Sequence, residues 1–244
     1  AREGAPVTVF EKRAQLGGIV RYVIPAFRIP EEAIEGDVAL CRALGVRVVL
    51  GQESGSAQEL LDQGYTDVIF ATGAWRPGQL QLEYGQAVNV LDFLEACKRD
   101  PNLEIGAQVA VIGGGMDAAR AARRLPGVQQ VRLVYRRSRR YMPADEEELE
   151  LALAEGVEFC ELLAPIGVRD GILTCEKMRL GAPDASGRRS PVPTGERVEL
   201  PAHTVIAAVG ERVDAAPYEA SGIFLNAKGR PAVHPETMET NLPG

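Results

Sequence analysis

One short stretch, residues 109–125, constrains the fold of this chain more than any other. It reads VAVIGGGMDAARAARRL: an apolar β-branched run, three glycines, and a segment rich in alanine and arginine. This order predicts a strand at 108–113, a tight turn and a helix at 116–125. The turn matches G-x-G-x-x-[GA], in which glycines let the backbone approach a pyrophosphate and the helix start supplies N–H donors. A tight corner that binds no ligand is the alternative.

The next predicted strand, 131–137, runs into a cluster of arginines. They are Arg136, Arg137, Arg139 and Arg140, with no acidic residue before Asp145. In a dinucleotide-binding fold the tip of this strand meets the adenosine ribose, where an acid favours NAD and basic residues favour the 2′-phosphate of NADP. Guanidinium groups bind phosphate in a bidentate fork, so the cluster predicts NADPH. A solvated basic turn paired with the acids at 146–148 is the alternative.

The first hundred residues predict a similar α/β unit. Strands are expected at 6–11, 46–51 and 67–74, and helices at 30–44, 56–64 with a Ser56 N-cap, and 88–99. Glu11 ends the first strand, where a carboxylate would bind the ribose hydroxyls of an adenosine, and Gly17-Gly18 follow it. A surface acid followed by an ordinary turn is the alternative. The sequence DPN at 100–102 indicates a domain boundary.

Further elements are expected after the arginine cluster. A helix is predicted at 144–156, a strand at 157–163, a hairpin with an Asp-Gly turn at 169–180, an exposed loop at 182–196 and a strand at 203–211. The tail from 222 predicts a strand, a turn and a loop. The acids at 145–148 could suggest a metal site, but successive helical residues point in different directions, so we interpret them as a helix N-terminus.

Composition narrows the possible partners. The 244 residues carry a net charge of −7, which argues against nucleic acid or an anionic membrane as a partner. No apolar run approaches the roughly 20 residues of a membrane span and no signal peptide opens the chain, so we expect a cytoplasmic protein. The cysteines are Cys41, Cys97, Cys160 and Cys175; without a CxxC pair, we expect buried thiols. The chain begins at Ala1 and ends at TNLPG, which we interpret as a fragment of a longer protein.

Five segments together resemble one protein family. They are VFEKRAQLGGIVRYVIPAFRIP, VIFATGA, VIGGGMDAARAA, LVYRRSRRYMPADEEELELA and VIAAVGE. In this order they are similar to the FAD- and NADPH-binding module of the glutamate synthase small subunit and of dihydropyrimidine dehydrogenase. Within the family the likeness is greatest to a flavin subunit assigned to selenate reduction. The similarity covers nearly the whole chain.

The resemblance implies a fold and a set of binding residues. The fold is α/β, with two Rossmann-like three-layer nucleotide-binding domains. An NADPH domain at 101–216 is inserted in a partial FAD domain at 1–100 and 217–244. By resemblance the FAD site contains Glu11, Gly17, Gly18, Ile19, Arg28, Thr72 and Gly73, and the NADPH site contains Gly113, Gly114, Gly115, Arg136, Arg137, Arg140, Ala208, Val209 and Gly210.

Two departures from the family pattern stand out. The family usually reads GxGNTAMDAA where this chain reads GGGMDAA, so about one helical turn is missing beside the expected pyrophosphate, and Met116 would lie against the phosphates. The amino-terminal FAD glycine loop and the carboxy-terminal Gly-Asp segment of the family both lie outside these residues.

The resemblance also implies a reaction class. Hydride passes from nicotinamide to flavin, and electrons continue to iron–sulfur centres in the parent protein or a partner subunit, selenate reduction being one end use. No catalytic side chain and no metal ligand are expected, and His203 and His234 show no catalytic constellation. Two alternatives stay open: a scaffold domain with a disabled nucleotide site, and an FAD-dependent monooxygenase-like enzyme.

Overall fold

The chain divides into two compact units. The computed structural model describes residues 1–142, 145–184, 187 and 189–243. The first unit comprises Ala1–Arg76 and Glu211–Gly244, and the second comprises Pro77–Gly210. The second unit is therefore inserted in the chain of the first. The boundaries differ from the expected 100 and 217, because β4 (Val88–Asn89) pairs with β11 (Thr204–Ala208) and α4 (Val90–Arg99) packs against α5 (Met116–Arg124).

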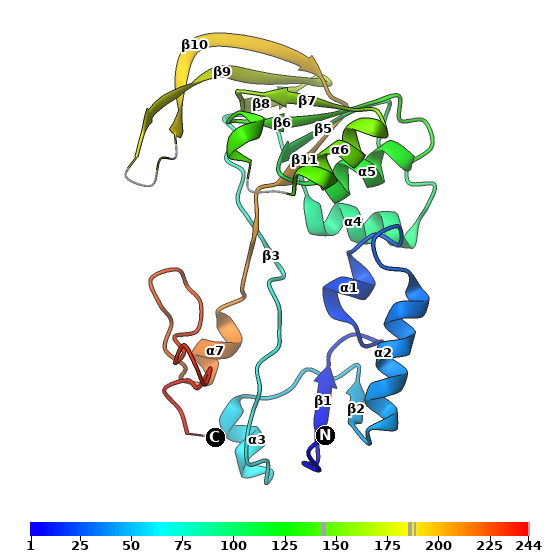
Figure 1. Cartoon of the computed structure of the whole chain (residues 1–244), viewed down its shortest axis with the longest axis vertical. Coiled ribbons are helices and arrows are strands. Elements are labelled where there is room, and N and C mark those ends of the chain that lie inside the picture. The colour runs from blue at the N-terminus through cyan, green and yellow to red at the C-terminus, as the bar shows by residue number, and fades with distance from the viewer. Residues whose placement is uncertain (143–144, 185–186, 188, 244) are drawn as a thin grey trace. The chain divides into compact units, whose positions relative to one another are not determined.

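A five-stranded parallel sheet forms the middle of the second unit (Figure 1). Its strand order is β4-β11-β5-β6-β7, with β5 at Gln108–Gly113, β6 at Gln130–Tyr135 and β7 at Val157–Glu161. The chain runs outward from β5 through β6 to β7, while β11 and β4 lie on the other side of β5. This reversal of direction beside β5 is a topological switch point, the place where ligands bind in open α/β sheets. The strands predicted around 108–113, 131–137 and 203–211 are confirmed.

The two faces of this sheet are covered by different layers. Helices α4, α5 and α6 (Glu146–Ala154) pack on one face. An antiparallel sheet of β8 (Leu163–Arg169), β9 (Ile172–Pro183) and β10 (Arg189–Pro201) covers the other. The core between the two sheets includes Ala110, Ile112 and Val134 from the parallel strands and Leu173 and Cys175 from β9. Since side chains alternate along a strand, one apolar set faces each layer, and the predicted three-layer arrangement is confirmed.

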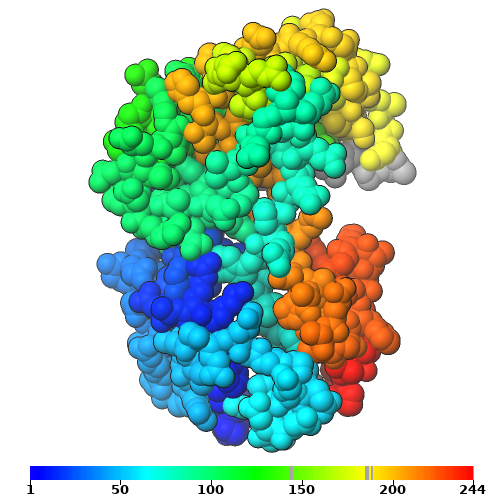
Figure 2. Space-filling view, turned by 180° about the vertical axis from the view of Figure 1, so that it is seen from behind, coloured from blue at the N-terminus to red at the C-terminus, as the bar shows by residue number. Residues whose placement is uncertain are grey.

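The hairpin β9–β10 replaces a predicted loop. Residues 182–196 were expected to be an exposed loop because they are rich in proline and glycine, and this prediction was wrong: most of them lie in two long paired strands (yellow in Figures 1 and 2). Strand β10 lies at the edge of its sheet, where proline is tolerated because the missing N–H faces away from the ladder. The predicted Asp-Gly turn is confirmed, with φ of +52° at Asp170 and +74° at Gly171.

The first unit contains a short parallel sheet and several helices. Strand β1 (Thr8–Glu11) pairs with β2 (Arg47–Leu50). The helices are α1 (Gly18–Tyr22), α2 (Glu31–Ala43), α3 (Ala57–Asp62) and α7 (Ala216–Ala220). The predicted Ser56 N-cap is confirmed as part of a capping box with Glu59. The short strands β3 (Arg76–Pro77) and β12 (Glu211–Arg212) pair with each other, and the 3₁₀ helix η1 (Arg139–Tyr141) belongs to the second unit.

The strand predicted at 67–74 is not formed. These residues have no regular structure, and the side chain of Ile69 is 89% exposed. A strand requires a hydrogen-bonded neighbour, and in the described part of the chain no strand pairs with this segment. A strand was also expected in the tail. In the described residues it is reduced to a single bridge between Leu225 and Pro231, together with the predicted turn and loop. Among the described residues, no helix combines the length and apolarity needed to cross a membrane.

Leu173→Ala tests the core between the two sheets. Leu173 is fully buried there, so we expect a loss of about 2–5 kcal/mol in the free energy of unfolding. Urea denaturation measures this loss. Leu151→Ala is the control, because Leu151 of α6 is 44% exposed and we expect it to cost less than about 1 kcal/mol. Equal losses for the two variants would contradict this assignment of the core.

Candidate nucleotide-binding sites

The glycine turn between β5 and α5 lies against the end of β11. Gly113 pairs in register with Ala208 and has a φ of +106°. A methyl group on Gly113 would lie 2.2 Å from the Ala208 carbonyl oxygen, and one on Gly115 would lie 2.4 Å from the Ala208 Cβ atom. No side chain fits at either position without movement of the neighbouring strand. The predicted residues Gly113, Gly115 and Ala208 are therefore brought into contact.

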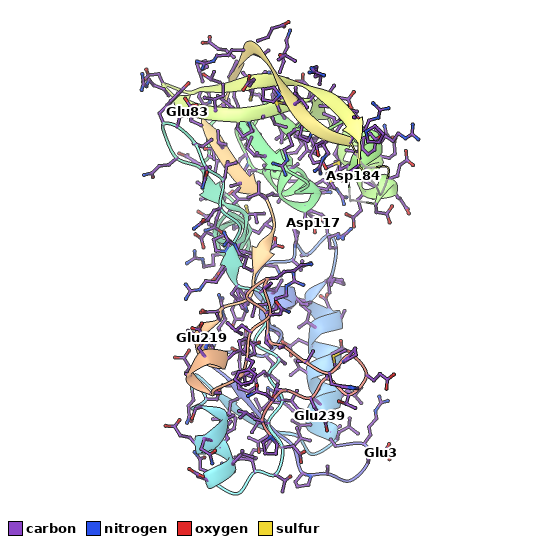
Figure 3. All side chains as sticks on the ribbon, turned by 90° about the vertical axis from the view of Figure 1, so that its left-hand side faces the viewer. Glu3, Glu83, Asp117, Asp184, Glu219 and Glu239 are labelled. Carbon is purple, nitrogen blue, oxygen red and sulfur yellow. The ribbon has the colours of Figure 1, made fainter. Side chains whose placement is uncertain are left out.

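The amino terminus of α5 faces the glycine turn. Gly115 is its N-cap and provides no side-chain cap for the first N–H groups of the nine-residue helix. Figure 3 labels Asp117 in the first turn of this helix. Met116, which was expected to lie against bound phosphates, is buried in the structure, with 3% of the residue exposed. Instead the exposed Gly114 covers the outside of the turn, where an added methyl group would meet only the Met142 Cε atom, at 3.8 Å.

The four arginines after β6 have different surroundings. Arg139 forms ion pairs with Glu146, at 3.2 Å, and with Glu150, both on α6. Hydrogen bonding to Glu150 raises the pKa of the Arg139 guanidinium, which stays charged. For Arg139, the alternative interpretation, a basic turn paired with acidic side chains, is therefore correct. Arg136 and Arg140 are exposed.

Arg137 is the most enclosed of the three arginines that the resemblance selects. Its side chain is partly buried, and its Nε atom is buried with no hydrogen-bond partner in the described part of the chain. A buried, unsatisfied guanidinium N–H is costly and is normally paired. An anion at this edge of the sheet would provide such a partner.

The arginine segment and the glycine turn belong to the same edge of the sheet. Ile112 of β5 is paired with Val134 of β6, so both strands end together. The Met142 Cε atom lies beside Gly114, which brings the segment after η1 to the glycine turn. Val209 and Gly210 follow β11 at this edge, and the Gly210 carbonyl accepts a 2.6 Å hydrogen bond from the Gly78 N–H. All the residues predicted for the second unit thus follow or end strands at one sheet edge.

In the first unit the predicted residues lie around the end of β1. The Glu11 carboxylate accepts a 2.8 Å hydrogen bond from the Arg13 N–H. Gly17 and Gly18 have positive φ values, +118° and +49°, and begin α1, which contains Ile19. A methyl group on Gly17 would lie 2.9 Å from the Arg21 Cβ atom, whereas one on Gly18 would meet open space.

Arg13 joins this end of β1 to the predicted Thr72-Gly73 turn. Its guanidinium lies 4.3 Å from the centre of the Tyr22 ring and 4.4 Å from that of Trp75. Gly73 is near Trp75, because a methyl group on Gly73 would lie 3.4 Å from the indole nitrogen. Sequence reasoning missed Arg13. No sequence pattern links it to Trp75, the only tryptophan in the chain.

Thr72 and Arg28 have separate surroundings. The Thr72 hydroxyl forms a 2.8 Å hydrogen bond with the hydroxyl of Tyr218, a buried residue of α7. Arg28 is exposed and lies in a turn in which its N–H donates to the Pro25 carbonyl. Thr72 is thus held by the returning segment of the chain, and Arg28 lies at the surface of the same unit.

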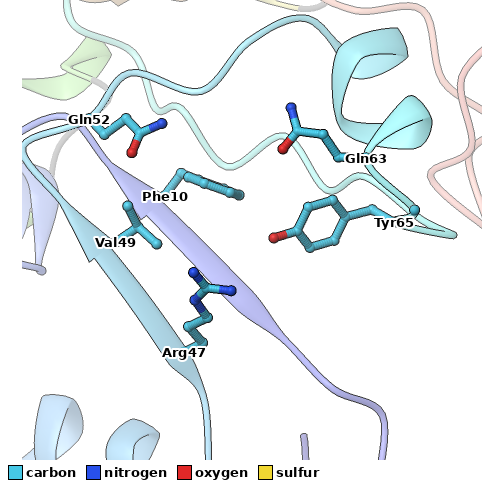
Figure 4. Close-up of a pocket in the computed structure, with 7 residues that line it drawn as sticks. Phe10, Arg47, Val49, Gln52, Gln63 and Tyr65 are labelled. Atoms are coloured by element: carbon cyan, nitrogen blue, oxygen red, sulfur yellow. The ribbon is translucent and has the colours of Figure 1, made fainter.

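A hollow of about 380 Å³ lies on the first unit (Figure 4). Phe10 and Tyr65, whose rings meet edge to face at 6.0 Å, form its apolar wall. Its other lining residues are Arg47, Val49, Gln52, Gln63 and Gly64. The hollow is adjacent to Glu11 in sequence, but its lining includes none of the predicted site residues.

The cysteines do not form a reactive thiol pair. Burial raises the pKa of Cys97 and Cys160 to about 11 and that of Cys175 to about 12, so these thiols stay protonated at neutral pH. The expectation of buried thiols is wrong for Cys41, which is exposed on α2 although it shares a helix face with the buried Ile34 and Val38.

The histidines and acids hold local structure. The His203 Nδ1 atom accepts a hydrogen bond from the Gln108 N–H at 3.2 Å, and His234 accepts from two backbone N–H groups of its own loop. Asp145 is the N-cap of α6, accepting from the Glu147 N–H, as the helix interpretation predicts. Across the described ranges, no three side chains of histidine, cysteine or acid are grouped to hold a metal.

Gly113→Ala tests the contact between the glycine turn and β11. Gly127→Ala is a matched control, since Gly127 also has a positive φ, +79°, but an added methyl group there meets open space. We expect the control to cost about 1 kcal/mol of unfolding free energy through backbone strain. The clash with Ala208 should cost about 1–3 kcal/mol more in Gly113→Ala. Urea denaturation of both variants measures the difference, and equal stability would contradict the close approach.

Comparison with known proteins identifies several relatives. The chain is 43% identical over 241 residues to YgfK of Escherichia coli K12, which covers 96% of this chain and 23% of YgfK. It is 36% identical to the NADP(+)-dependent formate dehydrogenase subunit beta of Moorella thermoacetica, over all of this chain and 37% of that subunit. It is 34% identical to the glutamate synthase [NADPH] small chain of Halomonas elongata, over 94% of this chain and 53% of that protein. The predicted likeness to glutamate synthase small subunits is confirmed, and the chain spans about a quarter to a half of these relatives.

A solved structure supports the fold. FprA from Mycobacterium tuberculosis superposes with a TM-score of 0.73 at 22% sequence identity, covering 94% of this chain and 70% of FprA. This likeness confirms the predicted α/β fold class. The family model for pyridine nucleotide-disulphide oxidoreductases matches residues 34–244. The chain therefore belongs to the pyridine nucleotide-disulphide oxidoreductase family.

Proposed function

We propose that this chain is an NADPH-dependent, FAD-containing oxidoreductase module. One observation carries the proposal: the glycine turn at 113–115 and the arginines after β6 meet at one edge of a parallel sheet, beside its switch point. Small residues there leave room for a ligand next to the backbone, and cationic side chains provide the charge to bind an anion. The names of two relatives, a formate dehydrogenase subunit and a glutamate synthase small chain, refer to NADP(+) or NADPH.

In the second unit, backbone and side-chain groups would bind two parts of NADPH, the pyrophosphate and the 2′-phosphate. The amino terminus of α5, whose N-cap carries no side chain, would hold the pyrophosphate with backbone N–H groups. Arg136, Arg137 and Arg140 would bind the 2′-phosphate, with Arg137 Nε contributing a buried donor. Val209 and Gly210 would line the same nucleotide. The buried Met116 leaves the turn open even though it is shorter than in the family.

In the first unit, the residues at the end of β1 would hold the adenosine part of FAD. Glu11 would bind the ribose hydroxyls, and Gly17 and Gly18 would allow the backbone to approach the pyrophosphate. Thr72-Gly73 would pass the flavin, and Ile19 and Arg28 would lie nearby. Arg13, whose guanidinium stacks on the rings of Tyr22 and Trp75, would keep the segments of Glu11 and Gly73 together. When bound, the two groups supply hydride transfer from nicotinamide to flavin, and the protein supplies binding and orientation.

We further propose that electrons leave the flavin for a partner. The names of the relatives include a subunit beta and a small chain, which indicates that those proteins act in assemblies. Because the three cysteine thiols with raised pKa values are protonated at neutral pH, a dithiol relay is not favoured within the described residues. Iron–sulfur centres outside these residues are the proposed acceptors. Selenate as the end acceptor and a cytoplasmic location stay predictions of the sequence.

Calorimetric titration with NADPH and NADH tests the nucleotide site. We expect NADPH to bind and NADH to bind much more weakly. Arg137→Ala should weaken NADPH binding about 10- to 100-fold, the loss of a charge-assisted hydrogen bond to phosphate, and leave NADH within about threefold. Lys177→Ala, on the β9–β10 hairpin, is the control and should change neither affinity. If the unaltered chain bound neither nucleotide, the scaffold alternative would replace this proposal.

Fluorescence of Trp75 tests the FAD site. Trp75 is the only tryptophan and contacts Arg13, so FAD bound beside Gly73 should quench its emission, since flavin absorbs in that range. Arg13→Ala should weaken FAD binding by about fivefold or more, since a guanidinium–aromatic contact contributes about 1 kcal/mol. Trp75→Phe removes the signal and provides the blank. Unchanged Trp75 emission at saturating FAD would mean that FAD does not bind beside Gly73.

A further inference from the structure

The four arginines after β6 divide into two kinds. Arg136, Arg137 and Arg140 form no ion pair with any acidic side chain in the described part of the chain. Arg139 is engaged on three sides: its guanidinium pairs with Glu146 and Glu150 of α6, and its backbone N–H donates to Glu161 of β7 at 2.8 Å. An arginine engaged by two carboxylates is poorly placed to bind a phosphate as well.

The segment around Arg139, residues 137–142, is held in place by several hydrogen bonds. The Met142 N–H donates to the Arg139 carbonyl and the Tyr141 N–H to the Ser138 carbonyl, each at 3.0 Å. The Tyr141 carbonyl accepts a 3.1 Å hydrogen bond from the hydroxyl of Tyr135, which ends β6. The Arg137 carbonyl accepts from the Leu162 N–H at 3.2 Å. The segment is thus bound to β6, to the chain after β7 and, through Arg139, to α6.

We propose that Arg139 is a positioning residue for the nucleotide site, rather than a fourth phosphate ligand. This inference rests on the proposed NADPH function. By binding α6, Arg139 holds η1, which contains Arg140 and begins two residues after Arg137, and so sets the directions of both side chains. Met142, at the end of the same segment, lies beside Gly114 of the glycine turn.

Arg139 also changes the electrostatics of the site. Glu146 and Glu150 are well exposed, with 82% and 58% of their side chains accessible, and belong to a helix whose first turn is wholly acidic. Unpaired carboxylates there would repel a dianionic phosphate. The Arg139 guanidinium, with one positive charge, offsets part of the negative charge of these two carboxylates. Selectivity for the 2′-phosphate thus depends on a residue that does not touch it.

Two variants separate positioning from direct binding because the two roles predict opposite signs. We expect Glu146→Gln/Glu150→Gln to weaken NADPH binding roughly threefold, although it removes two negative charges, because Arg139 loses its anchors. A direct phosphate ligand would instead be released by this change, and NADPH would bind more tightly. Unchanged or tighter NADPH binding would overturn the inference.

Arg139→Gln completes the test. It should weaken NADPH binding by roughly three- to fivefold and leave NADH within about twofold, so the ratio of the two dissociation constants falls. Arg139→Lys, which keeps one ion pair, should restore part of the ratio. A purely structural role would weaken both nucleotides equally and would overturn the inference. Lys177→Gln, which removes the exposed pair with Glu196 on the hairpin, is the matched control and should leave the ratio unchanged.

Amide hydrogen exchange provides a measurement that needs no nucleotide. In Arg139→Gln the backbone hydrogen bond to Glu161 remains possible, so any change reports the side chain alone. We expect faster exchange at the N–H groups of Tyr141 and Met142, and no change at these groups in Lys177→Gln. Unchanged exchange in Arg139→Gln would refute the anchoring role. If NADPH failed to bind while exchange increased, the proposed function would fail and the anchoring of the segment would stand.

Discussion

The close approach of the β5–α5 turn to the end of β11 is the constraint on which the second unit depends. The backbone of Gly113 is so near the Ala208 carbonyl that no side chain fits between them. The requirement has two consequences. It allows a parallel strand to pass directly into a helix at the centre of the sheet, and it leaves the helix N-terminus at the switch point without a side-chain cap from its N-cap residue, Gly115. The same packing therefore builds the core and opens the candidate site.

Charge at this sheet edge is arranged by pairing rather than by composition. The chain is acidic, and α6 begins with three glutamates that stabilise the helix dipole. An anion could not be held beside them unless their charge were locally balanced. Arg139 offsets part of that charge by pairing with Glu146 and Glu150, whereas no ion pair engages the neighbouring arginines among the described residues. Four arginines within five positions thereby have two kinds of surroundings, decided by which acids lie within reach.

In the first unit, side-chain contacts rather than strand pairing bring the candidate site residues together. Its described sheet has only two strands, so backbone pairing alone does not bring Glu11 and Gly73 together. The contact is made by side chains instead, with Arg13 between the rings of Tyr22 and Trp75. Such a stack buries apolar ring faces and retains a cation near the surface. The geometry of this site accordingly depends on a residue that has no place in the glycine or acid patterns.

Much of the fold could be predicted from the sequence, whereas the residues of both candidate sites stay predictions. Hydrophobic periodicity and glycine placement predicted the strands around 108–113 and 203–211, because these signals are local. The three-layer arrangement was predicted from the family resemblance instead. Residues 67–74 and 182–196 were predicted wrongly, since pairing with a neighbour, not composition, decides whether a segment becomes a strand. Only the tertiary structure decided that Arg139 is bound by acids while Arg137 is not, and that Arg13 joins two loops. Those outcomes depend on distances between residues far apart in the chain, which no local pattern contains.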